Sequence, residues 1–379
     1  MKKHINRILT LALTFVMVSS VLAGCGLGSK SEQSKTLLFS YDGSDVYLDE
    51  AWVYAKIAQT GFESQYASTF GDSMWSMQIS QDSEGNPVTM ENMVKQNVIV
   101  QIKQVKVLNK KAKELKISLT DEEKKLAAKN AKAFAGEPEG QAIFKETGAD
   151  QDLMQKIYEE NALASKVQQH VVKDVSTEVK DDEARKTTVY KLVFPTTKTN
   201  DETGEKEQLS ETKQAEQRKL AEEAYKKLKS GKSIEDLAKE YKVEDTAKET
   251  YGKGQSLGGK EFEKAIAGMK DGQTSKVMKT DEGYVIAKLV AFTDEEATMA
   301  EKENIVAGRQ SEAYQKQYDE WTKDLEKDWD YEKNVDQKVW AQVSFGKQQA
   351  EAEAEAVSNA VKEAGKKEAE QPEAATEEK

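Results

Sequence analysis

Residues 187–194 read TTVYKLVF, and Pro195 follows them directly. β-Branched and aromatic residues dominate this stretch, and such residues favour a strand with one side against a core. Proline lacks a backbone N–H group and therefore stops a strand in the interior of a sheet. The stretch predicts the first strand of a β-containing unit in the middle of the chain.

Helix and strand signals alternate downstream of this strand. The expected elements, in chain order, are a polar loop at 196–208, helices at 210–229 and 233–241, a glycine-rich stretch at 251–259, a short helix at 261–267, and strands at 276–278 and 283–292. Ser233, with Asp236 three residues later, is a typical N-cap for the second helix. The order predicts an α+β unit in which antiparallel-type strands are backed by helices.

Helical patterns flank this unit on both sides. On the N-terminal side we expect a hairpin at 36–48 around Asp42-Gly43, a helix from Asp49, a loop at 71–87, a long amphipathic helix from Met90, and helices at 139–147 and 150–173. Thr120 and Glu123 form a capping box that begins a further helix, and residues 293–296 form a second one that opens a long C-terminal helix. The N- and C-terminal segments together predict a helical region into which the α+β unit is inserted.

The N-terminus has the pattern of an export signal. A basic head at 2–7 precedes a short apolar run at 8–18, which is typical of a secretion signal and too short for a comfortable membrane span. The run ends in Leu22-Ala23-Gly24-Cys25, which resembles a bacterial lipobox. We therefore predict a signal peptide at 1–24, a lipid-carrying Cys25 with two or more acyl chains such as palmitate, and a tether at 25–35. The predicted location is the extracytoplasmic face of a Gram-positive-type cell membrane.

Composition excludes several classes of function. Lys and Arg total 56 against 68 Asp and Glu, so the net charge of −12 argues against a nucleic-acid binder. After signal removal only His170 would remain, and Cys25 is the single cysteine, so histidine-dependent triads, Cys/His zinc sites and intrachain disulfides are not expected. The glycines at 252–259 lack a following Lys-Ser/Thr and do not form a phosphate loop. We expect no cofactor, no metal and an acidic, low-complexity tail at 346–379.

Two stretches resemble PrsA-type foldase lipoproteins and, in the helical part, the periplasmic chaperone SurA. The first is the long helix from Met93 followed by AKELKISLTDEE at 112–123. The second resembles a parvulin domain in four passages, which are SIEDLA at 233–238, FEKA at 262–265, KDGQTS at 270–275 and TDEGYVI at 280–286. The resemblance implies a SurA-like helical chaperone region at 36–180, a parvulin-like domain at 181–293 with the order β-α-α-α-β-β, and a helix at 294–345 that completes the chaperone region.

The same resemblance implies a membrane-anchored foldase whose parvulin domain catalyses peptidyl-prolyl cis-trans isomerisation. Parvulins usually carry one histidine in the first strand and one in the last, and this chain has Tyr190 and Val285 at those places. The family's catalytic acid or thiol falls near Glu244 or Asp245. The resemblance assigns Phe262, Met269 and Val285 to substrate binding. Gly258 stands where the family has a larger apolar residue.

The same residues also allow other interpretations. Because both histidines are replaced, the domain could bind client chains as a non-catalytic holdase, since a fold does not fix a function. Phe262 could be an ordinary core residue, and Tyr190 could pack in a strand. The apolar residues Trp52, Met74, Trp75, Met77 and Met90 could form a client-facing cradle or plain core. The expected partners are unfolded exported proteins, and the sequence leaves open a homodimer or a purely structural surface role. A solute-binding role is disfavoured because it needs two βαβ lobes.

Overall fold

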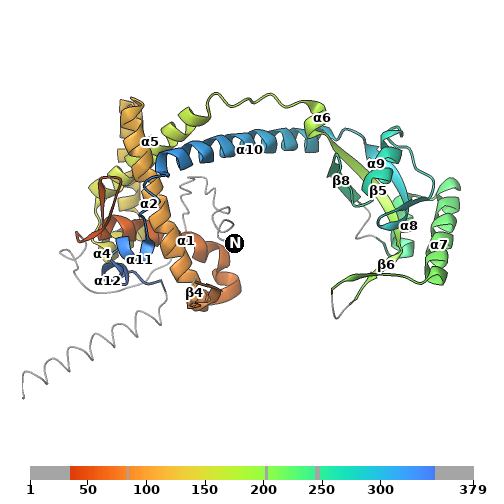
Figure 1. Ribbon diagram of the computed structural model, residues 1–379, viewed down its shortest axis with the longest axis horizontal. Helices are drawn as coiled ribbons and strands as arrows, with labels where there is room; N and C mark the ends of the chain where they lie inside the picture. The colour runs from red at the N-terminus through yellow and green to blue at the C-terminus, as the bar shows by residue number, and fades with distance from the viewer. Residues whose placement is uncertain (1–34, 83–84, 201–203, 244–247, 346–379) are drawn as a thin grey trace, which may run out of the picture. The chain divides into compact units, whose positions relative to one another are not determined.

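The computed structural model describes residues 35–82, 85–200, 204–243 and 248–345 (Figure 1). The chain divides into two compact units. Among the described residues, a helical unit comprises 35–173 and 314–345, and an α/β unit lies within 174–313. The first unit is therefore built from both ends of the chain, and the second is inserted between them.

Helices dominate the helical unit. Its elements are β1 (Leu37–Tyr41), β2 (Ser44–Tyr47), α1 (Leu48–Phe70), a 3₁₀ helix (Gly71–Ser76), β3 (Gln78–Gln81), β4 (Pro87–Thr89), α2 (Met90–Glu114), α3 (Asp121–Gly136), α4 (Pro138–Thr147), α5 (Gln151–Val172), the end of α10 (Glu295–Thr322), α11 (Tyr331–Asn334) and α12 (Gln337–Trp340). The Thr120–Glu123 capping box is present at the start of α3. The segment 71–87, expected to be a loop, instead contains the 3₁₀ helix and the β3–β4 hairpin.

Most of the residues that could have formed a client-facing cradle lie in the core of the helical unit. Trp52, Met74 and Trp75 are 2–4% exposed and belong to this core. Only Met77, at 39% exposure, is open to solvent, while Met90 packs against the edge of the core. The core interpretation therefore holds for the buried three, and the cradle interpretation is wrong for them.

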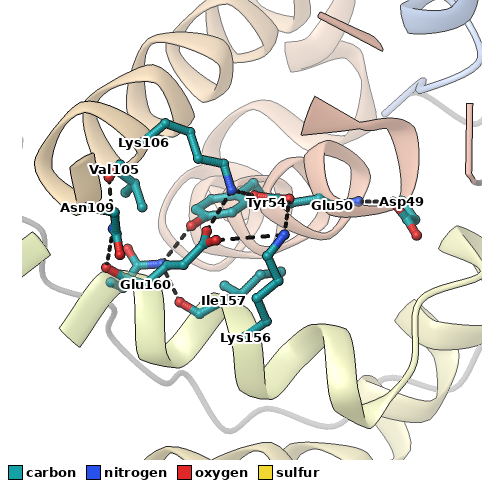
Figure 2. Close-up of polar contacts among 10 residues, drawn as sticks. Asp49, Glu50, Tyr54, Val105, Lys106, Asn109, Lys156, Ile157 and Glu160 are labelled. Carbon is teal, nitrogen blue, oxygen red and sulfur yellow. Dashed lines mark hydrogen bonds and ion pairs between the residues drawn. The ribbon is translucent and has the colours of Figure 1, made fainter. Parts of the chain in front are cut away.

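A charged cluster joins three helices inside this unit (Figure 2). Lys106 of α2 places Nζ 2.6 Å from Oε1 of Glu50 in α1 and 2.7 Å from Oε2 of Glu160 in α5. Lys156 of α5 adds a contact of 3.2 Å to Oε2 of Glu50. The side chains of Glu50 and Lys106 are 2% and 5% exposed, so each charge depends on the other for compensation.

The α/β unit is organised around one antiparallel sheet. Its elements are α6 (Asp181–Ala184), β5 (Lys186–Pro195), β6 (Thr197–Thr199), β7 (Lys206–Gln208), α7 (Glu211–Lys229), α8 (Ile234–Tyr241), β8 (Lys248–Gly252), α9 (Gly259–Ala267), β9 (Met278–Thr280), β10 (Gly283–Ala291) and the start of α10. The strand order is β8-β5-β10-β9, and every pairing is antiparallel. The expected α+β class with antiparallel strands is confirmed. The strand expected at 276–278 is displaced to 278–280, and β8 and the β6–β7 hairpin were not expected.

The sheet has an apolar layer on each face. Leu192 and Phe194 of β5 pack with buried residues of α7 and α8 on one face. Val189 and Val193 pack with Phe262 of α9 on the other. Alternation along β5 explains this division, because successive side chains of a strand point to opposite faces.

Asp294, rather than Thr293, caps the long helix α10. Its Oδ1 accepts the N–H of Ala297 at 3.1 Å, and its Oδ2 accepts the hydroxyl of Thr188 at 2.7 Å. The Thr188 hydrogen bond, followed by the Ala297 N–H, holds the pKa of Asp294 below its usual value. The expected capping box is therefore not formed: the N-cap lies one residue later than Thr293, and Ala297 at the third helical position has no side chain that could reach back to it.

We expect Asp294→Ala to destabilise the α/β unit by about 1 kcal/mol at neutral pH, since it removes a helix cap. The lowered pKa means that the contribution is present above the unfolded value of about 3.9 and is lost as pH falls through the folded value. Hydrogen exchange of β5 peptides at pH 7 and at low pH measures this difference, because the tryptophans all lie in the helical unit. An equal loss of stability at both pH values would contradict a role for the ionised Asp294 carboxylate. Asp294→Asn is the control, because it removes the charge alone.

Candidate functional site

Three residues that the sequence assigned to substrate binding lie together on the α9 face of the sheet. Phe262 of α9 is 1% exposed, Val285 of β10 is fully buried, and Met269 packs against the same apolar cluster from just beyond α9. The ring of Tyr251 lies 6.3 Å from that of Phe262. The structure therefore forms one apolar layer from residues far apart in sequence.

Tyr190 does not join this group. It packs with Leu192 and Phe194 on the face covered by α7 and α8. The two positions taken for the family's histidines, Tyr190 and Val285, therefore point to opposite faces of the sheet. The polar residue of β5 that shares the face of Val285 is Lys191, its neighbour, by the same alternation. Glu244, Asp245 and Cys25 lie outside the described residues.

Lys191 lies at the centre of a buried ionic group. Its side chain is 2% exposed, and Nζ lies 2.7 Å from Oε2 of Glu249 in β8 and 2.5 Å from Oε2 of Glu282. These carboxylates are 10% and 15% exposed. One ammonium therefore links the edge strand β8 to the turn between β9 and β10, across the centre of the sheet.

The turn that carries Glu282 is fixed by Gly283. This glycine has φ of +131°, a region that other residues rarely adopt. An added Cβ would lie 2.3 Å from the backbone oxygen of Phe194, so the two strands approach too closely for a side chain. Glycine at this position lets β10 begin against β5 and brings Glu282 within reach of Lys191.

Glu249 also holds the loop that covers Phe262. Its Oε1 accepts the N–H of Leu257 at 2.8 Å. The next residue, Gly258, lies directly on the aromatic ring, since an added Cβ would be 2.6 Å from Cγ of Phe262. The position of this loop, and with it access to Phe262, therefore depends on Glu249 and on the lysine that pairs with it.

The α9 face of the sheet therefore combines a buried apolar layer with a fixed ionic group. Lys191, Glu249 and Glu282 were missed by sequence analysis. The sequence did contain one signal for Lys191. Because side chains alternate along a strand, Lys191 faces the same side as Val189 and Val193, in a strand that was expected to be buried.

Neither a metal centre nor a membrane-spanning helix is found among the described residues. Across 35–82, 85–200, 204–243 and 248–345, His, Cys, Asp and Glu do not gather in groups of three or more suited to a metal ion. In the same ranges, no helix is both long and apolar enough to cross a membrane.

Comparison with known families identifies the class of the inserted unit. Residues 197–304 match the model of the PPIC-type PPIASE domain. The match contains Glu249, Phe262, Glu282 and Val285 and begins after β5, which carries Lys191. The α/β unit therefore contains a parvulin-type domain, as the four sequence passages predicted.

Solved structures of PrsA proteins and of a SurA-like chaperone also match this chain. The chain is 21% identical to the PrsA peptidylprolyl isomerase of Bacillus cereus, over 68% of this chain and 93% of that one, with a TM-score of 0.29. It is 14% identical to the PrsA foldase protein of Lactococcus lactis, over 83% and 99%, with a TM-score of 0.28. A Campylobacter jejuni structure from a pair described as SurA-like chaperones is 10% identical over 63% and 94%, with a TM-score of 0.26. The comparison with curated proteins finds no match.

Proposed function

We propose that this protein is an extracytoplasmic foldase that binds unfolded exported proteins and accelerates prolyl isomerisation in them. One observation carries the proposal. The PPIC-type match falls on a sheet whose α9 face gathers Phe262, Met269 and Val285 beside the Lys191 cluster. The helical unit, formed from both ends of the chain, is proposed to hold clients while the inserted domain acts on them.

Isomerase activity is tested in a refolding reaction limited by a proline. We expect catalytic amounts of the protein to accelerate refolding, and Phe262→Ala to remove most of that acceleration. Leu237→Ala is the matched control, because Leu237 is equally buried on the opposite face of the same sheet. Each substitution costs about 3 kcal/mol of packing, so hydrogen exchange must show that both variants remain folded. Equal rates for the two variants would contradict an active site on the α9 face.

A non-catalytic holdase is the second candidate, and burial favours it. Phe262 and Val285 are 1% and 0% exposed, and both family histidine positions hold other residues. A holdase suppresses aggregation of an unfolded client without changing the rate of its proline-limited refolding. Suppression without acceleration would therefore select this candidate, and absence of both effects would reject the foldase proposal.

Membrane attachment through Cys25 is the remaining part of the proposal. We expect Cys25→Ala to move the protein from the membrane fraction to the soluble fraction and to abolish incorporation of labelled palmitate, because stable anchoring needs more than one acyl chain. Ser29→Ala, in the predicted tether, is the matched control. A variant lacking Cys25 that stays with the membrane and keeps the label would contradict the anchor.

A further inference from the structure

A cavity of about 340 Å³ lies in the α/β unit between the start of β5, the end of β8 and helix α9. Its lining carries four cationic side chains and one carboxylate, in a protein whose net charge is −12. The cations are Arg185, Lys253, Lys260 and Lys264. Such a local reversal of charge favours an anionic ligand.

Two of the four cations already have a partner outside the lining, because Nη1 of Arg185 and Nζ of Lys253 lie 3.2 Å and 3.1 Å from the carboxylate of Asp182. Glu263 accepts the N–H of Gly254 at 2.8 Å through one oxygen and the N–H of Ser256 at 2.9 Å through the other. Among the described residues, Lys260 and Lys264 form no ion pair, and they lie one turn apart on the same side of α9. Two cations of the cavity are therefore available to a ligand.

Aromatic side chains form one wall of the cavity and hold its polar residues in place. The guanidinium of Arg185 stacks on the ring of Phe292 at 4.4 Å, and Thr187 donates its hydroxyl to the backbone oxygen of Phe292 at 2.8 Å. Tyr251, 6% exposed, forms part of the wall. Burial raises the pKa of the Tyr251 hydroxyl, and the carboxylates of Glu263 and Glu249 raise it further, so it stays protonated.

The positions of the backbone N–H groups and of the cationic side chains indicate which kind of anion the cavity would bind. A phosphate group is usually held by converging backbone N–H groups. Here the N–H groups of Gly254 and Ser256 are already occupied by Glu263. The cations come instead from a strand end, a loop and a helix face, around an aromatic wall. This layout suits several carboxylates spaced along an extended chain with an apolar side chain between them.

We propose that this cavity binds acidic segments of client chains, at a site that adjoins the Phe262 layer through Tyr251. The inference rests on the proposed foldase function, because it names the clients that such a protein would prefer. An acidic, partly apolar segment would be held by the cavity while a nearby proline reaches the α9 face of the sheet. Exposed lysines contribute modestly and are screened by salt.

Fluorescence anisotropy of the full chain with a labelled peptide tests this proposal. The peptide alternates Glu with Phe and contains no proline, and its partner peptide has Gln in place of Glu. We expect only the Glu peptide to bind, more weakly at about 0.5 M salt than at about 0.05 M. We expect Lys260→Gln/Lys264→Gln to weaken binding about fivefold. Lys219→Gln/Lys226→Gln removes the same charge from α7 on the other face of the sheet and should leave binding unchanged.

The outcomes separate this inference from the foldase proposal. Equal binding of the two peptides, or equal weakening by the two double variants, would overturn the acidic-segment site. If aggregation of a client without acidic segments is still suppressed in that case, the foldase proposal stands alone. If the Glu peptide binds as expected while client aggregation and refolding are unaffected, the cavity is supported and the foldase proposal fails.

Discussion

Replacing Lys191 by alanine is expected to destabilise the α/β unit by about 3–5 kcal/mol. The substitution leaves Glu249 and Glu282, which are 10% and 15% exposed, without the ammonium that lies 2.7 and 2.5 Å from them. Hydrogen exchange of β5 and β10 peptides measures the loss within this unit alone. Lys288→Ala is the control on the neighbouring strand, because Lys288 is 41% exposed and lies 3.9 Å from Glu235. Its cost should stay below about 1 kcal/mol.

A compensated variant separates charge from packing at this site. Lys191→Met combined with Glu249→Gln and Glu282→Gln removes all three charges and keeps most of the volume. We expect it to recover much of the lost stability, because a neutral group of similar shape avoids unpaired buried charge. An equally large loss of stability in this variant would contradict unpaired buried charge as the cause of the Lys191→Ala effect. If the variant is stable but no longer accelerates refolding, the ionic group has a role beyond stability.

The central strands were predictable from sequence, and the edge strands were not. β5 and β10 are rich in β-branched and apolar residues, and Pro195 and Gly283 mark their ends. β8 reads KETYG, and only its last two residues are buried. Its extended form comes from pairing with β5, which local sequence does not reveal. β6 and β7 consist of polar residues that are mostly exposed, so the segment resembled a loop.

The site was predicted in part for a similar reason. Phe262 and Val285 belong to motifs with fixed spacing, and the structure places both on one face. The resemblance placed Tyr190 at the position of the family's first histidine, and its side chain lies on the other face of the sheet because successive residues of a strand face opposite sides. Lys191 finds its partners 58 and 91 residues away in sequence. The local sequence pattern therefore predicts neither that Lys191 is buried in the site nor that it pairs with Glu249 and Glu282.

Lys106→Ala is expected to destabilise the helical unit by about 3–5 kcal/mol. Lys106 Nζ is the close partner of Glu50, whose side chain is 2% exposed, and it also contacts Glu160 (Figure 2). Without it, Glu50 would keep only Lys156, which is half exposed and lies 3.2 Å away. All five tryptophans lie in this unit, so fluorescence during urea unfolding reports its stability directly.

Lys110 provides the matched control one turn further along α2. Its side chain is 46% exposed and pairs with Asp42 at 2.5 Å, so Lys110→Ala should cost about 0.5 kcal/mol. Glu50→Gln combined with Lys106→Met should recover part of the loss, because it leaves no unpaired charge in the core. Similar losses for Lys106→Ala and Lys110→Ala would mean that burial does not strengthen the Glu50 pair. Exchange in β5 and β10 should stay unchanged in every variant of this set, because Lys106 and its partners belong to the helical unit.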